Sequence, residues 1–147
     1  MQLAYATPSH QYPLGYAMSM DRRRALLDWA AHVGACVIED DYDGDFACDS
    51  APPLPLMALM ALDPARVVYV GSFSKVLGPG LRLGFMACPP WLADAIARRK
   101  ALLNYGCPWL EQAVLARLIE YGDYSRHLYR LRRRCPCARP ARRSRPD

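Results

Sequence analysis

The stretch RVVYVGSFSKVLGPGLRLGF, residues 66–85, decides the fold class. Its first part is rich in β-branched side chains and predicts a buried strand over residues 66–73. A loop with glycine and proline follows over residues 74–80, and residues 81–88 predict another strand. Upstream, residues 35–40 (ACVIED) form an apolar run ending in carboxylates, which is typical of a strand buried on both faces.

Segments with helical spacing of apolar residues separate and follow these strands. A short strand over residues 2–8 leads into a loop, whereas residues 41–65 predict irregular structure. In the first helix, Leu26 and Ala30 recur at helical spacing, and Gly34 supplies a stop. The predicted helices span residues 21–32, 91–104 and 108–121, with a further one from about Asp123. Strands that alternate with helices predict an α/β fold with a largely parallel sheet.

The composition is that of a globular chain. Its 147 residues are 52% hydrophobic and 22% charged, which excludes an intrinsically disordered protein and allows one modest domain with a core. No apolar run approaches the roughly 18 residues that a membrane span needs. The first residues show neither the basic nor the long apolar region of a signal peptide, so we expect a cytoplasmic protein with no membrane partner.

The basic charge lies at the end of the chain. Residues 121–147 hold nine arginines against two aspartates, although the net charge of the whole chain is only +5. We expect one domain over residues 1–134 and an irregular basic tail over residues 135–147, where three prolines forbid a continuous helix. The tail composition suggests a frameshifted or truncated gene. Because no aromatic residue follows Tyr129, a nucleic-acid-binding arm is not favoured.

No metal site is expected. Four of the six cysteines occur singly, and Cys135 and Cys137 form C-P-C rather than the C-x-x-C of redox and zinc sites. Asp41, Asp43 and Asp45 alternate as in a calcium loop, but the glycine is misplaced and the distal glutamate is absent.

Three polar clusters lie at or near the ends of predicted strands. They are residues 7–11 (TPSHQ), 39–42 (EDDY) and 72–75 (SFSK). Ligands of open α/β sheets gather at the carboxyl ends of the strands. The coincidence of the three clusters therefore indicates a binding site at that edge.

Lys75 is the candidate nucleophile of this edge. It is one of only two lysines, the other being Lys100, in a chain that otherwise uses arginine. Lysine can lose its proton and act as an amine nucleophile, which arginine cannot. Lys75 could therefore attack an aldehyde, or it could be an ordinary lysine in a surface loop.

The other polar residues also allow two interpretations. Ser72, Ser74 and Arg82 suit phosphate oxygens, but they could equally be capping serines and an arginine in an ion pair. A carboxylate among residues 39–41 could keep a ring nitrogen protonated, or the group could form helix caps or a metal site. Tyr42 offers a phenol to a ring hydroxyl.

The order of the clusters resembles that of a known family. The stretches TPSHQYPLG (7–15), VIEDDYDGDF (37–46) and GSFSKVLGPGLRLGF (71–85) are similar to the aminotransferase-like domain of the MocR group of GntR-type transcription regulators. That domain belongs to the fold type I family that depends on pyridoxal 5′-phosphate (PLP). The resemblance extends to about Arg134 and implies part of the mostly parallel large domain of fold type I PLP-dependent enzymes.

The resemblance implies a role for each site residue. Lys75 would form the internal aldimine with PLP, and Asp40 would pair with the pyridine nitrogen, for which Asp41 is the competing candidate. Tyr42 would hydrogen-bond the ring hydroxyl, and His10 matches the loop near the ring. The implied phosphate ligands are Ser72, Ser74 and Arg82.

Three functions follow from the resemblance. The first is a domain that senses a small amine or amino-acid ligand for a transcription regulator, as a homodimer if complete. The second is an amino-transferring enzyme of class I and II, although Tyr12 stands where aminotransferases usually have asparagine. The third is a truncated remnant with neither activity, since neither the upstream DNA-binding module nor the C-terminal subdomain of the family is recognised in this chain.

Overall fold

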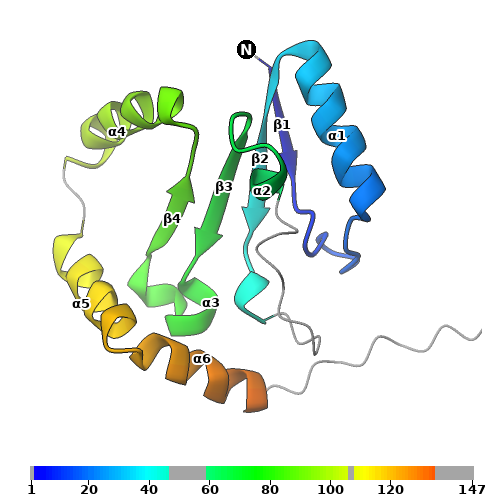
Figure 1. The fold of residues 1–147 in the computed structure, drawn as a ribbon. Coiled ribbons are helices and arrows are strands. Elements are labelled where there is room, and N and C mark those ends of the chain that lie inside the picture. Colours follow the sequence, from blue (N-terminus) through cyan, green and yellow to red (C-terminus); the bar gives the residue numbers. More distant parts are fainter. Residues whose placement is uncertain (1, 47–58, 106–107, 135–147) are drawn as a thin grey trace, which may run out of the picture.

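Four strands form the centre of the molecule. Figure 1 shows the computed structural model, which describes residues 2–46, 59–105 and 108–134. The strands are β1 (Gln2–Ala6), β2 (Ala35–Asp41), β3 (Val67–Ser72) and β4 (Gly84–Ala87), in the sheet order β1-β2-β3-β4. β1 and β3 run parallel to β2, whereas β4 runs antiparallel to β3. The predicted α/β fold with a largely parallel sheet is confirmed.

Six helices connect and follow the strands in the described part of the chain. They are α1 (Met20–Val33), α2 (Leu59–Leu62), α3 (Ser74–Leu77), α4 (Pro90–Asn104), α5 (Trp109–Glu120) and α6 (Asp123–Arg134). The longer helices lie within one residue of their predicted ends. The expectation of a loop over residues 74–80 is wrong in part, because α3 begins there and a 3-10 turn, η3 (Pro79–Leu81), follows it. The basic tail predicted over residues 135–147 lies outside the described residues.

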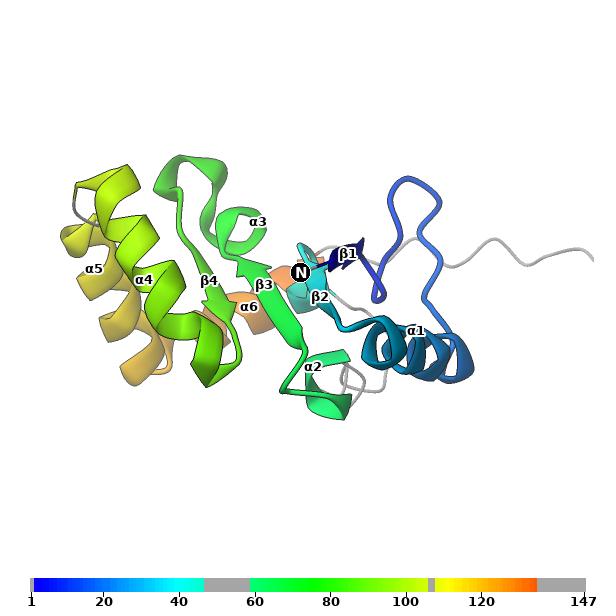
Figure 2. The same ribbon diagram turned by 90° about the horizontal axis from the view of Figure 1, so that it is seen from above.

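α1 covers one face of the sheet. The Ser19 side chain accepts a hydrogen bond from the Arg22 amide at the start of the helix, and Gly34 ends it in the left-handed conformation, with φ of 66°. The helix buries Leu27 and Ala30 in an apolar core that also contains residues of the strands and of α2. The other core residues are Ala35, Val37, Leu59 and Val67. Figure 2 shows α1 and α2 on the same side of the sheet.

The buried stripe of α1 contains a charged residue and leaves a large apolar residue exposed. Trp29 is 45% exposed, whereas Arg23 is only 3% exposed. Arg23, Leu27 and Ala30 share one face because they are spaced by four and three residues. An arginine in this face needs buried partners, and these are supplied by the site described below.

α6 holds α3 in place at the carboxyl end of β3. The chain turns back after α4 and α5, and Figure 1 shows α6 passing beside α3. His127 Nε2 lies 2.9 Å from the carbonyl oxygen of Val76 in α3. The Tyr124 ring meets the Phe73 ring edge-on, at 5.8 Å between centroids. These contacts fix the short helix that carries Lys75.

No helix of the described residues is long and apolar enough to span a membrane.

Gly84 provides a test of the packing between β3 and β4. A Cβ atom at Gly84 would lie 2.8 Å from the backbone oxygen of Gly71, whereas one at Gly80 would have no heavy atom within 4 Å. Gly84→Ala should therefore lower the free energy of unfolding by about 1–3 kcal/mol, because a backbone oxygen has to move. Gly80→Ala should leave it unchanged or raise it slightly. Urea denaturation followed by circular dichroism measures both, and equal effects would contradict the close approach of the two strands.

Candidate functional site

Successive carboxylates of β2 point to opposite faces of the sheet. Glu39 is fully buried on the α1 side, and Asp41, two residues on, accepts a hydrogen bond from the Tyr69 hydroxyl at 2.6 Å. Asp40 points to the other face, where the Tyr5 hydroxyl donates to its Oδ2 at 2.5 Å. The two candidates for a ring-nitrogen partner, Asp40 and Asp41, are thus separated by the sheet itself.

Asp40 shares its face with the end of β3. Asp40 pairs with Val70 in the parallel register, so Ser72, two residues after Val70, lies on the same face. The hydrogen bond to Asp40 raises the pKa of Tyr5, and that hydroxyl therefore remains a donor at neutral pH. This arrangement leaves the Asp40 side chain beside the carboxyl ends of β2 and β3.

Lys75 and His10 meet at Asp43. Lys75 Nζ lies 3.9 Å from Asp43 Oδ2 and 4.1 Å from the centroid of the Tyr42 ring. His10 Nδ1 lies 3.2 Å from the other carboxylate oxygen, Oδ1. The structure thus brings together His10, Tyr42 and Lys75, which come from three different segments of the chain.

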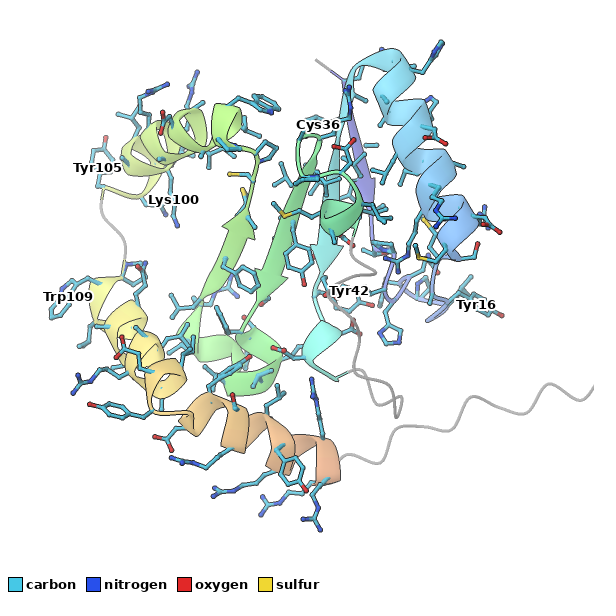
Figure 3. All side chains as sticks on the ribbon, viewed as in Figure 1. Tyr16, Cys36, Tyr42, Lys100, Tyr105 and Trp109 are labelled. Atoms are coloured by element: carbon cyan, nitrogen blue, oxygen red, sulfur yellow. The ribbon has the colours of Figure 1, made fainter. Side chains whose placement is uncertain are left out.

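The Tyr42 phenol is influenced by the charges of both Asp43 and Asp40. Partial burial raises the pKa of the Tyr42 phenol, and the negative charges of Asp43 and Asp40 raise it further. Both carboxylates therefore act on the same phenol, which stays protonated at neutral pH. Tyr42 lies at the carboxyl end of β2 (Figure 3).

The proposed phosphate ligands are only partly assembled. Ser72 Oγ accepts a hydrogen bond from the Ser74 amide at 3.2 Å. A backbone hydrogen bond of 3.1 Å from Phe73 to Leu83 brings the residue after Arg82 next to the serines. The exposed Arg82 side chain, however, contacts neither serine through a hydrogen bond or ion pair in the described part of the chain.

Arg82 has a strained backbone. Its φ of 51° lies in the left-handed region, which costs about 1–2 kcal/mol for a residue with a Cβ atom. Such strained residues cluster at functional sites because the surrounding structure has to hold them in place. Here the left-handed conformation of Arg82 turns the chain from η3 into β4. It also fixes the backbone position from which the guanidinium projects.

A buried ion pair supports the site from the α1 side. Arg23 Nη1 lies 3.9 Å from Glu39 Oε1, and both side chains are almost fully buried. Arg23 also donates to the carbonyl oxygens of Met18, at 3.0 Å, and Pro8, at 2.8 Å. Glu39 Oε2 accepts from the Met60 amide at 3.1 Å. Arg23 therefore holds both ends of the loop that contains His10, next to the strand that contains Asp40.

Burial dominates the electrostatics of this pair. Desolvation raises the pKa of Glu39 and lowers the pKa of Arg23, and in each case it outweighs the attraction of the partner. Sequence reasoning missed Arg23, because an arginine on an amphipathic helix ordinarily faces solvent. The spacing of Arg23 from Leu27 and Ala30 is the signal that could have found it.

The alternating aspartates do not converge on one point. Asp41 accepts from Tyr69, Asp43 contacts His10 and Lys75, and the third, Asp45, accepts from the Tyr124 hydroxyl at 2.6 Å. Among the described residues, no group of three or more His, Cys, Asp or Glu side chains could hold a metal ion. Cys36 and Cys88 are free thiols, whereas the other four cysteines lie outside the described residues.

Residues 5–136 match the family described as aminotransferase class I and II. The chain belongs to this family. This aminotransferase class I and II chain is 46% identical over 131 residues to the uncharacterised HTH-type transcriptional regulator YhdI of Bacillus subtilis, covering 88% of the chain and 27% of YhdI. It is 40% identical over 133 residues to the probable rhizopine catabolism regulatory protein MocR of Rhizobium meliloti, covering 90% and 26%.

Solved structures of the family confirm the fold class. The kynurenine aminotransferase of Pyrococcus horikoshii superposes with a TM-score of 0.81 at 31% identity, covering 90% of this chain and 32% of that one. The chain therefore has the fold of part of the large domain of fold type I aminotransferases. It spans about a quarter of the length of the curated regulators that it matches. The resemblance to MocR-type regulators is confirmed.

Proposed function

We propose that the chain is the PLP-binding core of a domain that senses a small amine or amino-acid ligand for a MocR-type transcription regulator. The observation that carries this proposal is the contact of the Lys75 amine with the Tyr42 ring, beside the strand end that presents Asp40. An amine, a phenol and a carboxylate at one edge are the groups that would hold and polarise an aromatic aldehyde.

The chemistry of these groups fits PLP. When bound, PLP supplies an aldehyde that condenses with amines and a pyridinium ring that withdraws electrons. Lys75 would bind it covalently, Asp40 would hold the proton on the ring nitrogen, and Tyr42 would donate to the ring hydroxyl. The phosphate ligands would be Ser72, Ser74 and Arg82, with His10 close to the ring.

The relatives favour sensing over catalysis. The two regulators named above are similar over almost the whole chain, and Tyr12 occupies the position where aminotransferases usually have asparagine. Such a regulator would act in the cytoplasm and as a homodimer, with its DNA-binding module in another part of the protein. The alternative is amino-group transfer, which the structural similarity to kynurenine aminotransferase supports.

A trapping experiment tests the cofactor proposal. The purified chain is mixed with PLP, its visible absorption band is recorded, and the product is reduced with borohydride and mapped by peptide mass spectrometry. We expect the label on Lys75. Lys100 on α4 is an internal control, because it lies apart from the carboxyl end of β2 (Figure 3).

The outcomes of this experiment separate the alternatives. A label on Lys100, or no label at all, would sink the proposal and leave a remnant without cofactor. Once mapping has assigned the label to Lys75, amine donors added to an unreduced sample should shift the absorption band without turnover if the domain senses its ligand. Sustained release of the keto product, with a keto acid added to accept the amino group, would instead indicate an aminotransferase.

A further inference from the structure

Asp43 lies at the junction of three segments. It follows β2, and its side chain is 20% exposed. One carboxylate oxygen contacts His10, which belongs to the loop between β1 and α1, and the other contacts Lys75 in α3. The same lysine amine lies over the ring of Tyr42, the residue before Asp43. Asp43 and Tyr42 therefore both contact the end of the flexible Lys75 side chain, which is 48% exposed.

The neighbouring carboxylates have other partners. Asp40 accepts from Tyr5, Asp41 from Tyr69 and Asp45 from Tyr124. Among the described residues, Asp43 is the carboxylate that forms an ion pair with Lys75. Each of the other three carboxylates accepts from one tyrosine hydroxyl, whereas Asp43 contacts His10 and Lys75.

We propose that Asp43 is a positioning residue for Lys75. It holds the lysine amine over the Tyr42 ring and connects it to the His10 loop, so that the amine faces an incoming aldehyde in one orientation. This inference rests on the proposed function of Lys75. Capture joins the Lys75 nitrogen to the aldehyde carbon, and the aldehyde oxygen leaves as water with the two protons of the neutral amine.

Two reagents separate positioning from simple exposure. With Asp43→Asn, the rate of PLP capture at Lys75 should fall by about tenfold, because a misplaced reacting group loses its favourable orientation. Labelling of Lys75 by acetic anhydride in the cofactor-free chain should rise two- to fivefold relative to Lys100, because the Lys75 amine is no longer held in an ion pair with the carboxylate. The small anhydride needs no particular orientation, so the two rates move in opposite directions.

Matched variants exclude a loss of folding. Asp43→Glu keeps the carboxylate and should restore most of the capture rate. Asp63→Asn removes a comparable, partly buried carboxylate that pairs with Arg66 at 3.4 Å, away from Lys75, and should change neither rate. The far-ultraviolet circular dichroism and urea midpoint of each variant show that the fold is kept.

The result that overturns this inference differs from the one that overturns the cofactor proposal. If the unmodified chain captures PLP at Lys75 and Asp43→Asn does so at the same rate, Asp43 does not position the lysine. If the unmodified chain captures no PLP at Lys75, the proposed function fails. In that case an unchanged anhydride ratio in Asp43→Asn would show that the ion pair is absent as well.

Discussion

Replacing Asp40 by asparagine is expected to weaken the binding of PLP by about 10- to 100-fold. A hydrogen bond to a charged group is worth about 1.5–3 kcal/mol, and asparagine cannot keep the ring nitrogen protonated. The Tyr5 hydroxyl, which orients Asp40 through a bond of 2.5 Å, can still donate to the asparagine oxygen. Titration of the chain with PLP, followed by the visible absorption band, gives the dissociation constant.

Asp41→Asn is the matched variant for this prediction. Asp41 lies next to Asp40 in the sequence but on the opposite face, where its partner is Tyr69. We expect Asp41→Asn to bind PLP within about twofold of the unmodified chain, provided that its urea midpoint shows a folded protein. The opposite ranking, with Asp41→Asn impaired and Asp40→Asn normal, would place the ring nitrogen on the Asp41 face of the sheet and contradict the proposed site.

Replacing Arg23 by alanine is expected to lower the free energy of unfolding by about 3–5 kcal/mol. Removing one partner of a buried ion pair leaves the other charge buried without compensation, in this case Glu39. The carbonyl oxygens of Pro8 and Met18 would also lose their guanidinium donor. The loss should be visible as a lower urea midpoint.

The neighbouring Arg22 supplies the control for Arg23. It lies on the exposed face of the same helix, and an exposed substitution of this kind ordinarily changes stability by no more than about 0.5 kcal/mol. Similar stability losses for Arg22→Ala and Arg23→Ala would mean that the buried pair contributes nothing specific, and the loop around His10 would then need another anchor.

The order and limits of the longer elements could be predicted because each of them has a local signal. The β-branched run of β3 and the helical spacing in α4 and α5 depend only on neighbouring residues. The antiparallel direction of β4 has no such signal, since it depends on the path of the chain through η3 and Arg82. The short helix at Lys75 was hidden because its four residues cannot show helical periodicity.

The site could be predicted as a set of residues but not as a set of contacts. His10, Tyr42 and Lys75 follow strands that are neighbours in a parallel sheet, so their clustering follows from topology. The sequence left Asp40 and Asp41 as competitors, whereas alternation along β2 places them on different faces. The sequence indicates Asp43 only as part of an incomplete calcium loop, because the contacts of Asp43 join it to residues 33 and 32 positions away in the chain.

The carboxylates at the end of β2 lie on an inner strand of the sheet, which affects how long their arrangement survives when the sheet opens. β2 and β3 have a hydrogen-bonded neighbour on each side, whereas β1 and β4 have one neighbour within the described residues. In this four-stranded sheet, thermal fraying is expected to begin at β1 and β4 and to reach β2 and β3 last. The backbone that carries the carboxylates at the end of β2 therefore keeps its hydrogen-bonded neighbours longest, whereas the Tyr5 hydroxyl that binds Asp40 belongs to the outer strand β1.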